Sequence, residues 1–162
     1  MGVIAAVLSL ILMTAYILVF IFKHGVPPSL SESFYVIRHK VTFSLTLAAT
    51  GALVIIPWIE VSQRGEGLAF LAVAGMMFVA ASPQFKESLS REVHYVAASL
   101  MAAACIAWEI LNGGVWIPLG VFLIIGLCNK KNIIFWLEIG LFLDAELSII
   151  GHLISEPMRG VM

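Results

Sequence analysis

The chain has 162 residues, of which 61% are hydrophobic and only 12% are charged, and its mean hydropathy is +1.05. A soluble domain carries about 45–50% apolar and about 25% charged residues, so a soluble globular fold is excluded and lipid is the solvent that fits. The net charge of -1 offers no basic patch, which excludes nucleic acid as a partner.

Six apolar segments follow one another along the chain and predict six transmembrane helices in a single domain over residues 1–162. The first segment is long enough, at about 20 residues, to cross about 30 Å of hydrocarbon. It lacks the basic flank and the cleavage site of a signal peptide, so we expect a retained helix. The predicted spans are residues 2–22, 41–59, 68–81, 93–111, 115–127 and 133–154.

Two parts of this pattern leave details open. After the first span, Pro27 and Pro28 end the helix, and Ser29 or Ser31 is a plausible N-cap for a short interfacial helix. The fifth run, residues 115–127, is short for a span. It either crosses fully, helped by a lysine reaching to the interface, or forms a re-entrant hairpin. The charge distribution favours the full crossing.

Basic residues are unequally divided between the two sides of this topology. Arg64 and Arg159 lie on the side of the termini. By the positive-inside rule the richer side faces the cytoplasm, which places both termini outside and the protein in the inner (plasma) membrane. The richer side carries Lys23, Arg38, Lys40, Lys86, Arg91, Lys130 and Lys131.

Tryptophan side chains favour membrane interfaces. We therefore expect Trp58, Trp108 and Trp116 at the outer interface and Trp136 at the inner one. Small residues let membrane helices approach closely, and those at short helical spacing mark candidate packing faces. These small residues are Ala48, Ala52, Ala69, Ala72, Gly75, Ala98, Ala102, Ala103 and Ala107.

The sixth span carries polar residues at membrane depth, where a carboxylate is costly and normally faces protein or water. Asp144, Ser148 and His152 follow at intervals of four and form one stripe. Glu138 projects beside this stripe, and Glu146 lies further round the helix. The functional interpretation is a proton or cation path through the bundle. The structural interpretation is neutral carboxyl groups bonded to neighbouring helices, or a subunit contact in a homo-oligomer.

A second group of polar residues falls at the predicted cytoplasmic ends of the helices. Imidazole and carboxylate groups can bind a metal, but no HxxxH or HExxH spacing is present. We therefore expect no bound metal, no cofactor and no catalysis. The residues of this group are Ser31, Glu32, His39, Glu92 and His94.

Three segments resemble small multi-pass membrane proteins from gut bacteria and their phages. They are residues 26–35 (VPPSLSESFY), 75–86 (GMMFVAASPQFK) and 93–95 (VHY), and the likeness covers about residues 26–111. This resemblance implies a multi-pass helical fold and brings no activity with it.

The chain is also similar to the alkaline ceramidase-like hydrolase superfamily, whose membrane enzymes use a Ser, an Asp and three His around zinc over seven helices. Ser31 and His94 match two of those positions. The last helix offers His152 alone where the superfamily has a His pair, and one helix is absent. This resemblance implies a membrane-embedded metal-dependent hydrolase with an inner-face site as an alternative.

The sequence thus predicts an all-α, polytopic membrane helical bundle whose partners are the lipid bilayer and a proton or cation. The leading hypothesis is a transport-related or channel-like protein that uses the acidic sixth span. Besides the hydrolase, the second alternative is a structural or interaction protein of the envelope.

Overall fold

The computed structural model describes residues 1–84 and 86–155, which form helices and connections without a strand. The predicted all-α class is therefore confirmed for this part of the chain. Arg159, which counted toward the predicted charge asymmetry, lies outside it. In chain order the elements are α1 (Gly2–His24), the 3-10 helix η1 (Leu30–Glu32), α2 (Ser33–Val36), α3 (Val41–Val61), α4 (Glu66–Ala81), α5 (Ser88–Asn112), α6 (Ile117–Cys128), the 3-10 helix η2 (Lys130–Asn132) and α7 (Ile133–Ser155).

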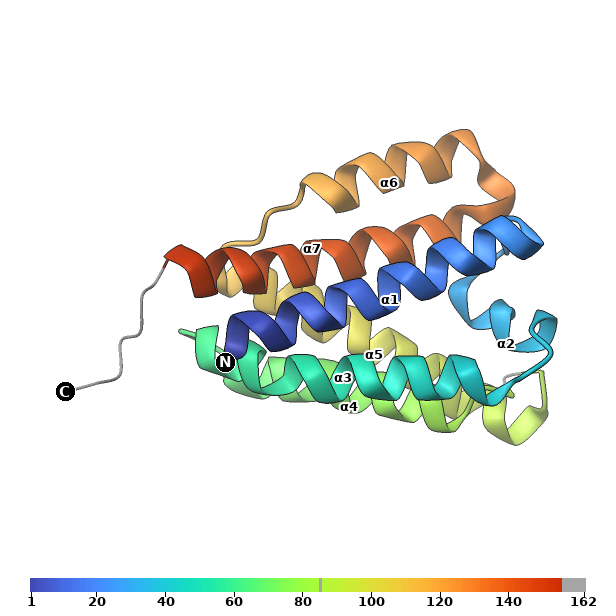
Figure 1. Cartoon of the computed structure of the whole chain (residues 1–162), viewed down its shortest axis with the longest axis horizontal. Helices are drawn as coiled ribbons and strands as arrows, with labels where there is room; N and C mark the ends of the chain where they lie inside the picture. Colours follow the sequence, from blue (N-terminus) through green and yellow to red (C-terminus); the bar gives the residue numbers. More distant parts are fainter. Residues whose placement is uncertain (85, 156–162) are drawn as a thin grey trace.

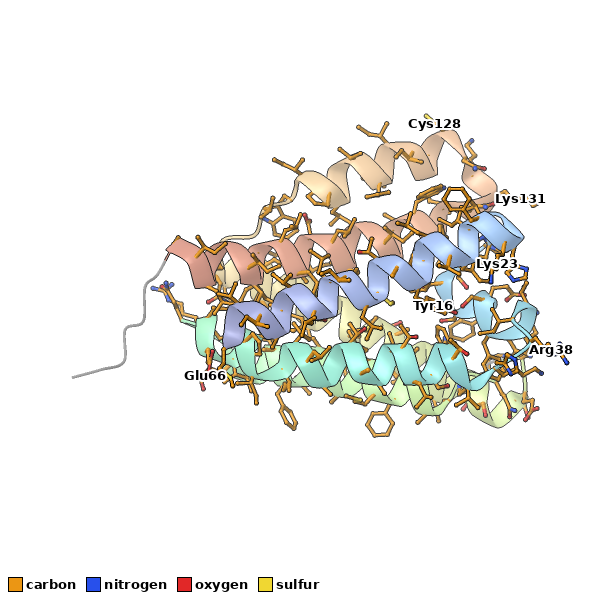
Figure 2. All side chains as sticks on the ribbon, viewed as in Figure 1. Tyr16, Lys23, Arg38, Glu66, Cys128 and Lys131 are labelled. Atoms are coloured by element: carbon orange, nitrogen blue, oxygen red, sulfur yellow. The ribbon has the colours of Figure 1, made fainter. Side chains whose placement is uncertain are left out.

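The six longer helices pass back and forth along the molecule, so that α1 begins and α7 ends at the same end (Figure 1). The short helix α2 lies at the opposite end, which we call the α2 end. Lys23, Arg38 and Lys131 lie at the α2 end, whereas Glu66 lies at the other end (Figure 2). Three basic residues from two of the predicted cytoplasmic loops thus lie at the same end of the molecule.

All six predicted helices are present, with small differences at their ends. Among the described residues, three helices are long and apolar enough to cross a membrane: α1, α3 and residues 90–112 of α5. Helices α4 and α6 are apolar but shorter, and the 12 residues of α6 extend only about 18 Å. The run 115–127 contributes one continuous helix alongside α7 and no hairpin (Figure 1).

The connection between α1 and α3 folds back into the bundle. Helix α1 ends at Gly25, whose φ of 79° favours glycine. Ser29 caps η1 as predicted, because its hydroxyl accepts a hydrogen bond from the backbone N–H of Glu32 at 3.3 Å. Ser33 and Phe34 of α2 are buried. The segment predicted as an interfacial helix is therefore part of the core.

Small residues set the closest helix contacts. A side chain at Gly75 of α4 would meet the backbone oxygen of Ala97 on α5 at 2.8 Å. One at Gly140 of α7 would meet the Cα of Leu119 on α6 at 3.1 Å. These glycines allow the α4–α5 and α6–α7 pairs to pack backbone against backbone.

The predicted small-residue faces are partly confirmed. Ala69 and Ala72 of α4 are fully buried. Ala52 of α3 and Ala103 of α5, however, are exposed. The interior faces of α3 and α5 combine other small residues, Gly51, Ala97 and Ala104, with larger ones that include the two tryptophans described next.

Two tryptophans of the predicted outer belt are buried inside the bundle. Trp58 and Trp108 are 3% and 0% exposed, and their rings pack edge to face with centroids 5.6 Å apart. The Trp108 Nε1–H donates to the hydroxyl of Ser62 at 2.7 Å, and that hydroxyl donates to the backbone oxygen of Trp58 at 2.7 Å. The two indoles thus join α3 to α5 in the core, where edge-to-face packing of the rings and the hydrogen bond of Trp108 stabilise the contact.

Candidate functional site

Three polar side chains in the middle of α7 are buried inside the bundle. Asp144, Glu146 and Ser148 are 0%, 2% and 3% exposed. Asp144 is equally far from Ile133 and Ser155, about 17 Å along the helix axis. The prediction that the two acids face protein and not lipid is confirmed, as the cost of a carboxyl in hydrocarbon requires.

Glu146 is linked to α1 and α3 through a serine hydroxyl. The Oγ of Ser9 lies 2.6 Å from Oε1 of Glu146 and 3.2 Å from the backbone oxygen of Thr50. A hydroxyl has one proton. When the Glu146 carboxyl is ionised, the Ser9 hydroxyl therefore donates its hydrogen bond to that carboxyl. When the carboxyl is protonated and donates to Ser9, the hydroxyl donates to the backbone oxygen of Thr50 instead. The position of the carboxyl proton and the direction of the Ser9 hydrogen bond are linked.

Glu109 of α5 is a buried acid that the sequence analysis did not identify. Its Oε2 accepts a hydrogen bond from the Ser148 hydroxyl at 3.3 Å, and Ser148 accepts one from the backbone N–H of Val115 at 3.0 Å. The carboxyl packs on Gly114, where any side chain would collide with it. A carboxylate inside the apolar run 93–111 was the visible signal that could have identified it.

Asp144 is the least satisfied of the three acids. Both of its carboxyl oxygens are buried without a hydrogen-bond partner among the described residues. The backbone N–H of Leu119, near the start of α6, is close enough to act on the carboxyl electrostatically but does not form a hydrogen bond with it. Glu109 lies within electrostatic reach of Asp144. The hydrogen bond between Ser148 and Glu109 ties this acid of α5 to the same part of α7 that carries Asp144 and Glu146.

The other two predicted residues of the polar path lie away from this group. Oε2 of Glu138 accepts a hydrogen bond from the backbone N–H of Leu30 at 2.6 Å, which ties α7 to η1. His152 packs edge to face on Trp108 with ring centroids 6.0 Å apart. The predicted set of five is therefore divided into a central group, one acid nearer the α2 end and one histidine near the opposite end.

A cavity of about 430 Å³ lies beside Glu146. Its wall is almost wholly apolar, and its carboxyl and hydroxyl groups come from Glu138, Glu146 and Ser31. Three of its lining residues are exposed: Ile106 of α5, Leu123 of α6 and Ile134 of α7. The cavity thus reaches from the core to the surface on the side of these three helices.

The residues predicted at the inner ends of the helices have separate contacts. Glu32 forms an ion pair with Lys86. His94 is buried, and its Nδ1 donates to the backbone oxygen of Ser82 at 2.9 Å. These contacts join the α1–α3 connection to residues after α4 and hold the start of α5 against the end of α4.

The remaining members of that group are equally dispersed. His39 and Glu92 are exposed, whereas Ser31 is buried at the cavity wall. Within residues 1–84 and 86–155, no group of three or more His, Cys, Asp or Glu side chains is placed to hold a metal ion.

Comparison of the chain with protein families, with curated proteins and with solved structures finds no match. The site is therefore interpreted from its own chemistry. Carboxyl groups buried near the middle of a helical bundle can take up and release protons, and their free oxygens can accept hydrogen bonds or pair with a cation.

Proposed function

We propose that the protein is an integral membrane protein of six spans that moves protons or cations across the inner (plasma) membrane through its acidic centre. The group formed by Glu109, Asp144 and Glu146 carries this proposal. Four of its buried carboxyl oxygens have no hydrogen-bond partner within the described part of the chain. Such groups are costly at membrane depth and mark ion and proton pathways.

Two serine hydroxyls give this group adjustable hydrogen bonds. Ser9 lies beside Glu146, and Ser148 lies beside Glu109. A hydroxyl can turn from donor to acceptor when a neighbouring carboxyl gains a proton, which is the behaviour that a proton relay needs. Glu138 shares the cavity wall with Glu146 and extends the route toward the α2 end.

The proposed orientation has both termini outside, because the basic residues gather at the α2 end. The shorter helices α4 and α6 then cross with local thinning of the bilayer and with Lys130 reaching toward the interface. In a Cys128→Ser background, which removes the exposed thiol, Gln63→Cys should react with an impermeant reagent from outside and Ser88→Cys should not. The opposite pattern would overturn the orientation. The region 157–160, also expected outside, lies beyond the described residues.

Flux through purified protein in liposomes tests the function directly. The protein should dissipate an imposed proton or cation gradient faster than protein-free liposomes do, and Glu146→Gln should return the rate to the protein-free level. Glu66→Gln is the matched control, since it removes an exposed carboxyl at one end of the molecule. Wild-type protein that carries neither protons nor Na⁺ or K⁺ would overturn the proposal.

A further inference from the structure

The cavity beside Glu146 has the size and lining of a ligand site. Its volume of about 430 Å³ falls within the range of about 300–1,000 Å³ that is typical of small-molecule pockets. Such pockets combine an apolar wall with a few polar groups that orient the ligand. Here the wall comes from apolar residues of the long helices, and the orienting groups are Glu138 and Glu146.

Glu146 holds an unused acceptor just behind the wall of this site. Its side chain is buried and lines the cavity, Oε1 is bonded to Ser9, and Oε2 has no partner among the described residues. A buried acceptor without a donor costs free energy, and that cost is relieved when a ligand supplies the missing N–H or O–H. An ammonium group supplies three N–H donors together with the opposite charge.

The opening of the cavity indicates where the ligand comes from. Helix α6 packs chiefly against α7, and the cavity reaches the surface on the side of α5, α6 and α7, where Ile106, Leu123 and Ile134 are exposed. Ala102 of α5 is half-buried and also lines the cavity. Apolar residues on the outside of the bundle face lipid in the proposed membrane arrangement, so a ligand enters sideways from the hydrocarbon and not from water.

From these features we infer that the cavity binds a lipophilic amine, an alkylammonium whose chain lies along the apolar wall and whose nitrogen pairs with the carboxyl group of Glu146 once that side chain turns toward the cavity. Binding alone goes beyond the proposed function and does not require it. As a transported substrate the amine rests on that function, because the same carboxyl would then exchange a proton for the ammonium group.

Equilibrium binding to the full chain in lipid nanodiscs tests this inference. The probes are dodecylamine, 1-dodecanol and dodecanoate, which share a chain length and differ in the head group, with protein-free nanodiscs to subtract partition into lipid. Dodecylamine should bind saturably and more tightly than the alcohol or the acid. Glu146→Gln should weaken its binding at least about tenfold, as expected for the loss of a hydrogen bond to a charged group.

Neighbouring alanines provide a matched pair that tests the position of the ligand. Ala102→Phe places a ring in the cavity and should abolish dodecylamine binding, whereas Ala103→Phe, at an exposed position outside the lining, should leave it unchanged. Monodisperse Glu146→Gln protein keeps the test valid if the Ala102 variant does not fold. Equal binding of 1-dodecanol, unchanged binding by Glu146→Gln, or no saturable binding above protein-free discs would each overturn the inference. Protein that binds dodecylamine without carrying protons or cations would overturn the proposed function alone.

Discussion

At the end of the bundle where α3 meets α4, the side chain of Asn112 makes four hydrogen bonds, whereas in the middle of α7 the side chain of Asp144 makes none with the described residues. The Asn112 amide donates to the backbone oxygens of Arg64 and Trp108 and accepts from the backbone N–H groups of Gln63 and Arg64. Polar side chains at this end hold a connection together. The carboxyl at the centre contributes nothing comparable to the fold.

The same contrast exists within α7. Glu138 is bonded to the backbone N–H of Leu30 at 2.6 Å, while Asp144 lies in the next two turns of the helix with both oxygens unpaired. A buried polar group without a partner costs about 1–3 kcal/mol, and more if it is charged. A protein that keeps such a group gives up stability, and the usual reason is function. The comparison therefore separates an acid that supports the fold from one that does not.

The largest expected effect on stability is that of Glu138→Leu. The leucine removes the acceptor of the Leu30 N–H, which then stays buried without a partner, and the free energy of unfolding should fall by about 1–3 kcal/mol. Glu138→Gln keeps an oxygen acceptor at the same place and should lose less than half as much. Unfolding in mixed micelles by added SDS measures both. If Glu138→Leu were as stable as wild type, Glu138 would not support the fold, and it would not differ from Asp144 in this respect.

Asp144→Leu should behave in the opposite way. Leucine has the same branching as aspartate, and it replaces two unpaired buried oxygens with methyl groups that need no partner. Stability should stay the same or rise by up to about 2 kcal/mol in the same SDS assay, while proton or cation flux in liposomes is lost. A loss of stability as large as that of Glu138→Leu would show that Asp144 has a stabilising partner, and would place it with the acids that support the fold.

The helices of this fold were predictable because each is a largely apolar run bounded by Pro, Gly or charged residues, although α5 and α7 also contain acidic residues. The inward orientation of Asp144 and Glu146 was predictable as well, since hydrocarbon would not tolerate them. Which face of the other helices points inward was not predictable, because those helices are apolar all round. For this reason the exposure of Ala52 and the burial of Trp58 and Trp108 inside the bundle were not predicted.

The partners of the central acids could not be predicted either. Ser9 and Glu146 are 137 residues apart in the chain, and Ser148 and Glu109 are 39 apart. No local pattern couples positions so distant, and a single serine in an apolar run resembles many packing serines. The cavity depends on the same long-range arrangement, because its wall is assembled from helices at both ends of the chain.

The smallest expected effect concerns the ion pair between Glu32 and Lys86 at the α2 end. Like the hydrogen bond of Glu138, this ion pair connects two segments that are distant in the chain. The ammonium group of Lys86 also lies 4.2 Å from the centroid of the Tyr35 ring. The two side chains are, however, 25% and 52% exposed, so water screens the charges and the pair should contribute only about 0.2–1 kcal/mol. A double-mutant cycle with Glu32→Gln and Lys86→Met isolates this coupling energy, which should shrink further at high salt because exposed charges are screened. A salt-insensitive coupling above about 2 kcal/mol would mean that the pair is shielded from water, and that polar pairing at the α2 end stabilises the fold at its surface as well as at Glu138.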